Sequence, residues 1–95
     1  MAKYDVAHIR EQGQDMVIIP VDAAFTRKSA SDQDDIHNSL QYAASDAGLK
    51  GNVVLIWNTG SQVGFRAPRQ WHPFFKSPGI WQLVMRNINR TLTIT

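Results

Sequence analysis

The chain has 95 residues, of which 43% are apolar and 19% are charged, and this composition is typical of one folded domain, residues 1–95, rather than of a disordered chain. It contains no cysteine, which excludes disulfides, thiolate metal sites and a cysteine nucleophile and favours a reducing, cytoplasmic location. The longest apolar run, residues 16–21, is far shorter than the roughly 20 residues of a membrane span, so no membrane association is expected.

Charge is segregated along the chain. Residues 1–46 carry eight acidic and four basic side chains, whereas residues 47–95 carry six basic side chains and no acidic one. This pattern predicts pairing of the two halves within the fold, pairing between subunits, or a basic face for an anionic partner. The sequence leaves these three arrangements open.

The first predicted elements are two strands. Residues 4–11 alternate loosely between the two faces of a strand, residues 12–15 predict a turn, and residues 16–25 form a β-rich apolar run. Pro20 interrupts that run and has no amide hydrogen for a sheet ladder. We therefore expect the second strand at a sheet edge, or with a bulge near residue 20.

A helix is predicted next. Ser31, with Asp34 three residues later, is typical of a helix N-terminus, and Gly48 supplies the left-handed cap that ends such a helix. The apolar residues between these signals recur at helical spacing: Ile36, Leu40, Ala43 and Ala47.

A β-hairpin and a second helix follow. Residues 52–57 predict a buried strand, residues 58–61 a turn, and residues 62–67 a returning strand that ends before Pro68. The second helix is predicted by one apolar face, with Ser77 as its cap and Pro78 in its first turn: Ile80, Trp81, Val84, Met85 and Ile88.

The predicted fold class is α+β, a small antiparallel sheet with two helices in the order β-β-α-β-β-α. The tail, residues 91–95, alternates Leu and Ile with Thr and is compatible with a short additional C-terminal strand. The alternative is a ferredoxin-like βαββαβ arrangement, which leaves out the first strand and counts the tail. We prefer the first order, because the alternative leaves almost no loop after Arg90.

Catalytic and metal motifs have little support. His8, His37 and His72 lie on different predicted elements, without the spacing of a known motif. Asp34 and His37 share a helix face, but zinc sites need three or four ligands. No serine stands in a nucleophile elbow, and the glycines form neither a Walker loop nor a dinucleotide fingerprint. The sequence predicts no cofactor and no metal site, leaves any catalytic residue unidentified, and disfavours an enzyme.

The strongest signal for binding is a segment in which basic and aromatic residues alternate. Its predicted binding residues are Arg66, Arg69, Trp71, His72, Phe74, Phe75 and Lys76. Such residues hold single-stranded nucleic acid, with cations on phosphates and rings on bases, or grip an acidic peptide. The alternative is that the rings are the core of a small domain and the arginines its solvated rim. The run 71–75 is so dense that we expect at least one ring to be exposed.

Three functional hypotheses follow. The leading one is a non-enzymatic binding or assembly module, a homo-oligomer such as a homodimer, that uses the aromatic-rich loop and the edges of its sheet. The second is binding of nucleic acid or another polyanion through the acid-free half, with Arg66 and Arg69 clasping phosphates. The third is a small-ligand or catalytic pocket under the aromatic loop. In the assembly hypothesis the arginines instead face the carboxylates of Asp32, Asp34 and Asp35.

Overall fold

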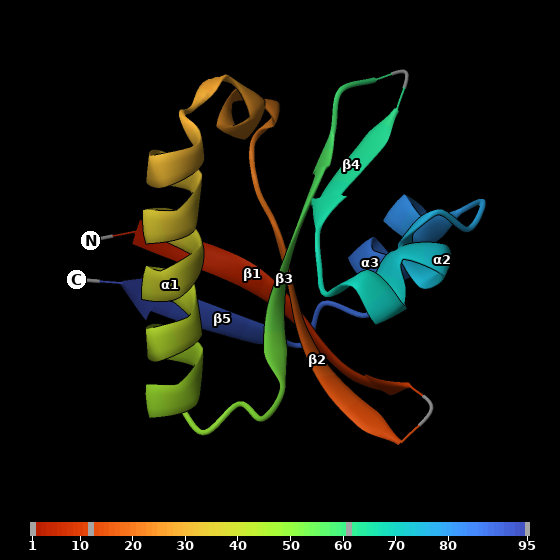
Figure 1. Ribbon diagram of the computed structural model, residues 1–95. Helices are drawn as coiled ribbons and strands as arrows, with labels where there is room; N and C mark the ends of the chain where they lie inside the picture. The colour runs from red at the N-terminus through yellow and green to blue at the C-terminus, as the bar shows by residue number, and fades with distance from the viewer. Residues whose placement is uncertain (1, 12, 61, 95) are drawn as a thin grey trace.

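One five-stranded sheet organises the molecule, whose computed structural model describes residues 2–11, 13–60 and 62–94 (Figure 1). In chain order the elements are β1 (Ala2–Glu11), β2 (Gln14–Pro20), the 3₁₀ helix η1 (Ala23–Arg27), α1 (Ala30–Asp46), β3 (Asn52–Asn58), β4 (Val63–Arg66), the 3₁₀ helix η2 (Arg69–Trp71), α2 (His72–Phe75), α3 (Ile80–Arg86) and β5 (Arg90–Ile94). The predicted α+β class, the order β-β-α-β-β-α and the C-terminal strand are confirmed. Parts of the predicted turns and tail, namely Gln12, Ser61 and Thr95, lie outside the described residues.

The strand order is β4-β3-β2-β1-β5, and neighbouring strands are antiparallel except for the parallel pair β2 and β3. The expectation of a wholly antiparallel sheet is wrong at this pair. The chain between β2 and β3 passes through α1, and such a helical crossover returns it to the same end of the sheet. The ferredoxin-like alternative is also wrong, because β1 lies within the sheet between β2 and β5.

We expected Pro20 to mark an edge strand or a bulge, and the edge alternative is wrong, because β2 is the central strand of the sheet. Pro20 is the last residue of β2 and lies beyond the last residue paired with β1, which is Ile18. On the other side the ladder to β3 continues past the proline, where the Val21 amide donates to the Ile56 carbonyl at 2.8 Å. The missing amide hydrogen therefore falls where β1 has already turned towards β5.

Strand β1 is shared between two partners. Its second half, Ala7 to Glu11, pairs with β2, and its first half, Ala2 to Val6, pairs with β5. Just before β5, the Asn89 side chain pairs with the backbone of His8. Its Oδ1 accepts from the His8 amide and its Nδ2 donates to the His8 carbonyl, both at 3.0 Å. The side-chain amide thus adds two hydrogen bonds to β1 beyond Val6, the last β1 residue paired with β5.

The helix caps differ from the predicted ones by a few residues. Ser29, not Ser31, caps α1, and its Oγ accepts from the Asp32 amide at 3.1 Å. Gly48 has a φ of 81° after α1, which confirms the left-handed cap. Helix α3 begins after Gly79, also left-handed, whereas the Ser77 hydroxyl donates to the carbonyl of Pro73. A second left-handed glycine therefore replaces the expected serine cap.

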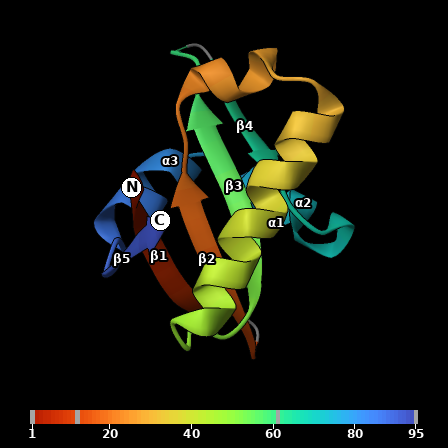
Figure 2. The same ribbon diagram turned by 90° about the vertical axis from the view of Figure 1, so that its left-hand side faces the viewer.

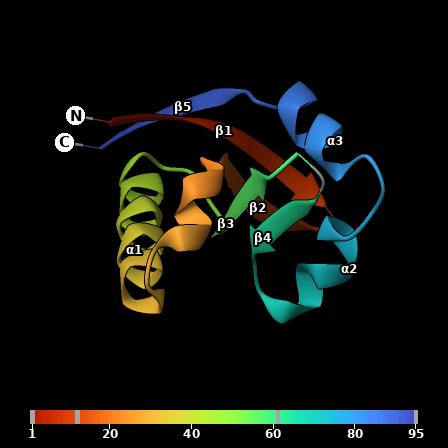
Figure 3. The same ribbon diagram turned by 90° about the horizontal axis from the view of Figure 1, so that it is seen from above.

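Two helical layers cover opposite faces of the sheet (Figure 3). Helix α1 crosses one face of the sheet (Figure 2). Leu40 of this helix joins Val17 of β2 and Leu55 of β3 in one apolar cluster. The short helices η2, α2 and α3 cover the other face, where Ile18, Ile56 and other buried residues form a second cluster. Within the part of the chain that is described, no helix has the length and apolarity that crossing a membrane requires.

The β3–β4 hairpin is tightly packed at Gly64. Gly64 pairs with Trp57 across β3 and β4, and a Cβ at this position would collide with the indole of Trp57. That indole in turn packs on Phe25, with ring centroids 5.3 Å apart. Gly64→Val should displace the indole and lower the free energy of unfolding by about 1–3 kcal/mol, as overpacked substitutions do. Thermal melting and tryptophan fluorescence measure both effects, and an unchanged melting temperature would contradict the packing described here.

Candidate functional site

The basic-aromatic segment is largely core. The side chains of Trp71 and Phe75 are 5% and 1% exposed, while His72 and Phe74 are half-buried. Phe75 lies between Phe65 and Phe74, with ring centroids 5.5 and 5.1 Å away. The expectation of at least one exposed ring among residues 71–75 is therefore wrong, and the reading of these rings as core residues is favoured.

Local helix formation explains how so many rings find cover. We predicted a loop between residues 68 and 79, but η2 and α2 place all of residues 69–75 in helical turns. In a helix, residues four apart lie on one face, so Trp71 and Phe75 point together into the sheet. A loop would have given no such common direction.

Each of the three histidines forms a hydrogen bond with a backbone carbonyl. In each ring Nε2 lies within hydrogen-bond distance of a carbonyl oxygen: His8 and the Lys50 carbonyl at 2.9 Å, His37 and the Val53 carbonyl at 2.9 Å, and His72 and the Ala67 carbonyl at 3.1 Å. Because a carbonyl only accepts, each Nε2 carries the hydrogen. These nitrogens tie segments of the fold together and are not free to act as bases.

Arg66 connects the two oppositely charged halves of the chain. It forms an ion pair with Asp34 of α1, and its Nε donates to Nδ1 of His37 at 3.1 Å. The two side chains that shared a helix face as metal-ligand candidates are therefore both bound to a guanidinium. Among the residues placed by the structure, no group of three His, Asp or Glu side chains is arranged to hold a metal.

The predicted clasp of Arg66 and Arg69 is not assembled. Arg66 is turned towards α1, whereas Arg69 is exposed in η2, and Trp71 is buried. The expectation that these arginines face acidic residues is confirmed for Arg66 and Asp34 within one chain. Arg69 and Lys76 remain as exposed cations of the segment.

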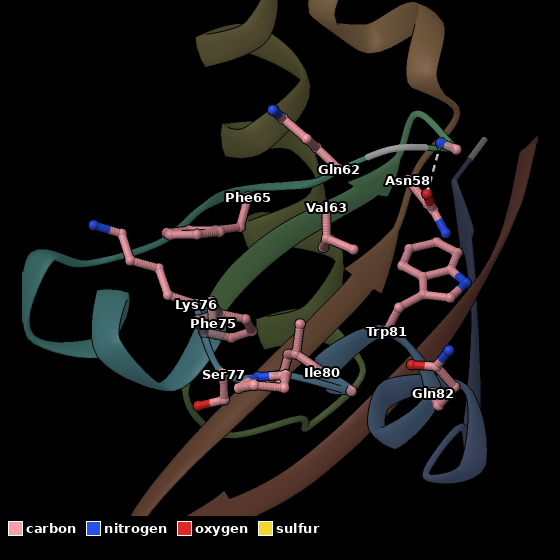
Figure 4. Close-up of a pocket in the computed structure, with 13 residues that line it drawn as sticks. Asn58, Gln62, Val63, Phe65, Phe75, Lys76, Ser77, Ile80, Trp81 and Gln82 are labelled. Atoms are coloured by element: carbon pink, nitrogen blue, oxygen red, sulfur yellow. Dashed lines mark hydrogen bonds between the residues drawn. The ribbon is translucent and has the colours of Figure 1, made fainter.

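A groove lies between the tip of the β3–β4 hairpin and the turn that joins α2 to α3 (Figure 4). Its volume is about 460 Å³. Two of the seven predicted binding residues, Phe75 and Lys76, line it. The others, including Arg69 and Phe74, do not. The sequence analysis missed the hairpin side of this groove, because nothing in the local pattern shows that residues 58–65 approach residues 75–82.

A second recess lies between the C-terminal half of α1 and β5, and Tyr42 is its most prominent residue. The recess has a volume of about 630 Å³ and is lined by Tyr42, Asp46, Leu92 and neighbouring residues. Tyr42 is 80% exposed. The sequence analysis did not single it out, although a signal was present: Tyr42 is a large ring on the polar side of the predicted helix, away from Leu40 and Ala43.

No family model, curated protein or solved structure matches this chain.

The ion pair of Arg66 predicts different outcomes for two charge reversals. Arg66→Glu places a carboxylate beside Asp34 and removes the donor to His37, so the free energy of unfolding should fall by about 1 kcal/mol or more. Arg69→Glu changes an exposed side chain and should alter it by no more than about 0.5 kcal/mol. Thermal melting at low salt compares the stability of the two variants. Equal melting temperatures would show that the contacts of Arg66 do not stabilise the fold.

Proposed function

We propose that this chain is a non-enzymatic assembly module that forms a homodimer through the outer edge of β5. The observation that carries the proposal is that β5 ends the sheet on one side, where it pairs with β1 and with no further strand of the described chain. An edge strand presents a row of amide and carbonyl groups that a second chain can pair with. The aromatic-rich loop, which we first expected at the interface, is largely buried and has no part in this proposal.

The two edges of the sheet differ in how well they are protected. Strand β4 has four residues, ends in Arg66 and is followed by Pro68 after one intervening residue. Short length, charge and proline are the usual means of blocking an edge. Strand β5 has no proline, and Arg90 at its start is its one charged residue. Self-association is therefore favoured at β5.

Exposed apolar surface lies beside the same edge. The last turns of α1 extend past β5 on the side of its outer edge (Figure 1). Tyr42 stands on those turns and is the one large hydrophobic residue that the described chain leaves exposed. A second copy paired with β5 would bring its own α1 alongside and cover Tyr42. Aromatic residues are enriched in protein interfaces for this reason.

Charge favours an antiparallel pairing of the two β5 strands about a twofold axis at Leu92. That register sets Thr91 opposite Thr93 of the second copy and Arg90 opposite Ile94, so the two arginines lie at opposite ends. A parallel pairing would set Arg90 beside its own counterpart, and like charges directly opposite are destabilising. Antiparallel pairing also gives the isologous contact typical of dimers.

Two double substitutions at the same positions test this register. Thr91→Lys with Thr93→Lys sets lysine against lysine across the axis, so the protein should be a monomer of 10.7 kDa. Thr91→Lys with Thr93→Glu sets lysine against glutamate and should retain the dimer of the wild-type chain. Both threonines are exposed, and a lysine at position 93 would lie opposite Lys3 of β1 at a cost of no more than about 1 kcal/mol, so the fold should survive either change. Light scattering at roughly 50 µM protein measures the mass.

The wild-type chain is the decisive reference in that experiment. A strict monomer at this concentration would overturn the proposal. Equal masses for the two double variants would overturn the register. Circular dichroism of each variant confirms that a change in mass is not a loss of fold.

A second function, binding of nucleic acid or another polyanion, is supported by the layer made of residues 67–89. This stretch forms η2, α2 and α3 and carries Arg69, Lys76 and Arg86, all exposed, with no acidic residue. The opposite layer, residues 22–46, carries five acidic and two basic side chains. One layer of the molecule therefore carries three exposed cations and no carboxylate of its own.

Retention on immobilised single-stranded DNA or heparin tests the polyanion proposal. The wild-type chain should be retained at about 50 mM salt, where phosphate contacts are strong, and released at higher salt. Arg69→Glu with Lys76→Glu should abolish retention, whereas Arg27→Glu with Lys28→Glu, on the acidic layer, should not. Absence of wild-type retention at this salt concentration would remove the proposal.

A further inference from the structure

We propose that the groove between the β3–β4 hairpin and the α2–α3 turn binds a small amphipathic anion, with a flat apolar body and one acidic group. This site is separate from the outer edge of β5 and does not depend on self-association. It takes its ligand class from the residues that line it.

The groove has an apolar floor and an aromatic wall at each end (Figure 4). Val63 of β4 and Ile80 of α3 lie in its middle. Phe65 stands at one end and the indole of Trp81 at the other, and both rings are half-buried, so each keeps a surface open to the groove. A flat apolar molecule placed between these rings would cover surface that the fold leaves exposed.

Lys76 gives the groove its charge. Among the residues that line the groove, Lys76 is the one charged side chain, and it lies beside the Phe65 ring (Figure 4). Other lining side chains, Gln62, Ser77 and Gln82 among them, are polar but uncharged. A single cation at one end of a groove with an apolar floor favours a ligand with a single acidic group at the matching end. Asn58, near Trp81, offers an amide at the opposite end, although its Oδ1 already accepts from the Gly60 amide at 2.8 Å.

The size of the groove fits a small molecule rather than a polymer. Its volume of about 460 Å³ lies within the range of roughly 300–1,000 Å³ that is typical of small-ligand sites. Gly60 and Gly79 stand on its two sides, both with positive φ and with open space where a Cβ would be. The two sides of the entrance are therefore clear of side chains at these points.

A pair of fluorescent probes separates the apolar part of recognition from the charged part. Anilinonaphthalene sulfonate carries a flat apolar body and one acidic group, and N-phenylnaphthylamine carries the same body without the acid. We expect saturable binding of both probes by the folded chain. The Trp81 indole signal in an NMR titration should shift, while that of Trp57, which packs on Phe25 on the other face, should not.

Lys76→Met is the informative variant, because Lys76 is exposed and its replacement should not disturb the fold. It should weaken binding of the sulfonate about 2- to 5-fold, as loss of an exposed charge contact does, and binding of the uncharged probe less than 2-fold. Lys50→Met, an exposed lysine outside the groove, is the matched control and should change neither.

Several results would overturn the proposal. These are the absence of saturable binding, an equal loss of both probes in Lys76→Met, or a shift of Trp57 in place of Trp81. Sulfonate fluorescence that appears only as the near-ultraviolet circular dichroism is lost would also overturn it, because that dye binds to partly unfolded chains. None of these results bears on the mass of the protein, so the dimer stands or falls separately.

Discussion

Burial of β2 and β3 on both faces is the constraint on which the rest of the structure depends. Residues 16–19 and 53–56 are all fully buried, and strands buried in this way need a cover on each side of the sheet. The long helix α1 covers one side. On the other side the described part of the chain has three short helices, η2, α2 and α3. Large rings such as Trp71 and Phe75 supply the volume that longer helices would otherwise provide. The aromatic density of this segment is thus first a requirement of the core.

Local sequence patterns predicted the helices and strands of this fold well, but they predicted poorly which strands lie side by side in the sheet. The strand at residues 52–57, the return at 62–67 and the cap at Gly48 depend on residues close in sequence, so periodicity and turn chemistry sufficed for them. The central place of β2 depends on the strands beside it, and the rule that proline marks an edge misled us because Pro20 falls where β1 has left β2. For the candidate site, composition pointed to Lys76 and Phe75, but no local signal places Trp81 opposite Phe65.

The segregation of charge along the sequence becomes a segregation between layers. Residues 22–46, with five acidic and two basic side chains, fold over one face of the sheet, and residues 67–89, with no acidic side chain, fold over the other. Arg66 crosses this division, because β4 brings it to the rim of the α1 layer beside Asp34. This ion pair occupies Arg66, which we had expected to bind phosphate. Asp34 is 32 residues away in sequence, so no local pattern predicts the contact.

Strand β5, near the end of the sequence, pairs with β1, near its beginning. The Asn89 side chain bonds to His8, which is 81 residues away in sequence. Closing such a long loop costs more conformational entropy than forming the β3–β4 hairpin, whose strands are neighbours in sequence. Folding should therefore begin around β2, β3 and β4 and end when the C-terminal strand docks. The two bonds between Asn89 and the His8 backbone then fix the register of a late-forming strand that has one neighbouring strand, since a slip by one residue would break both.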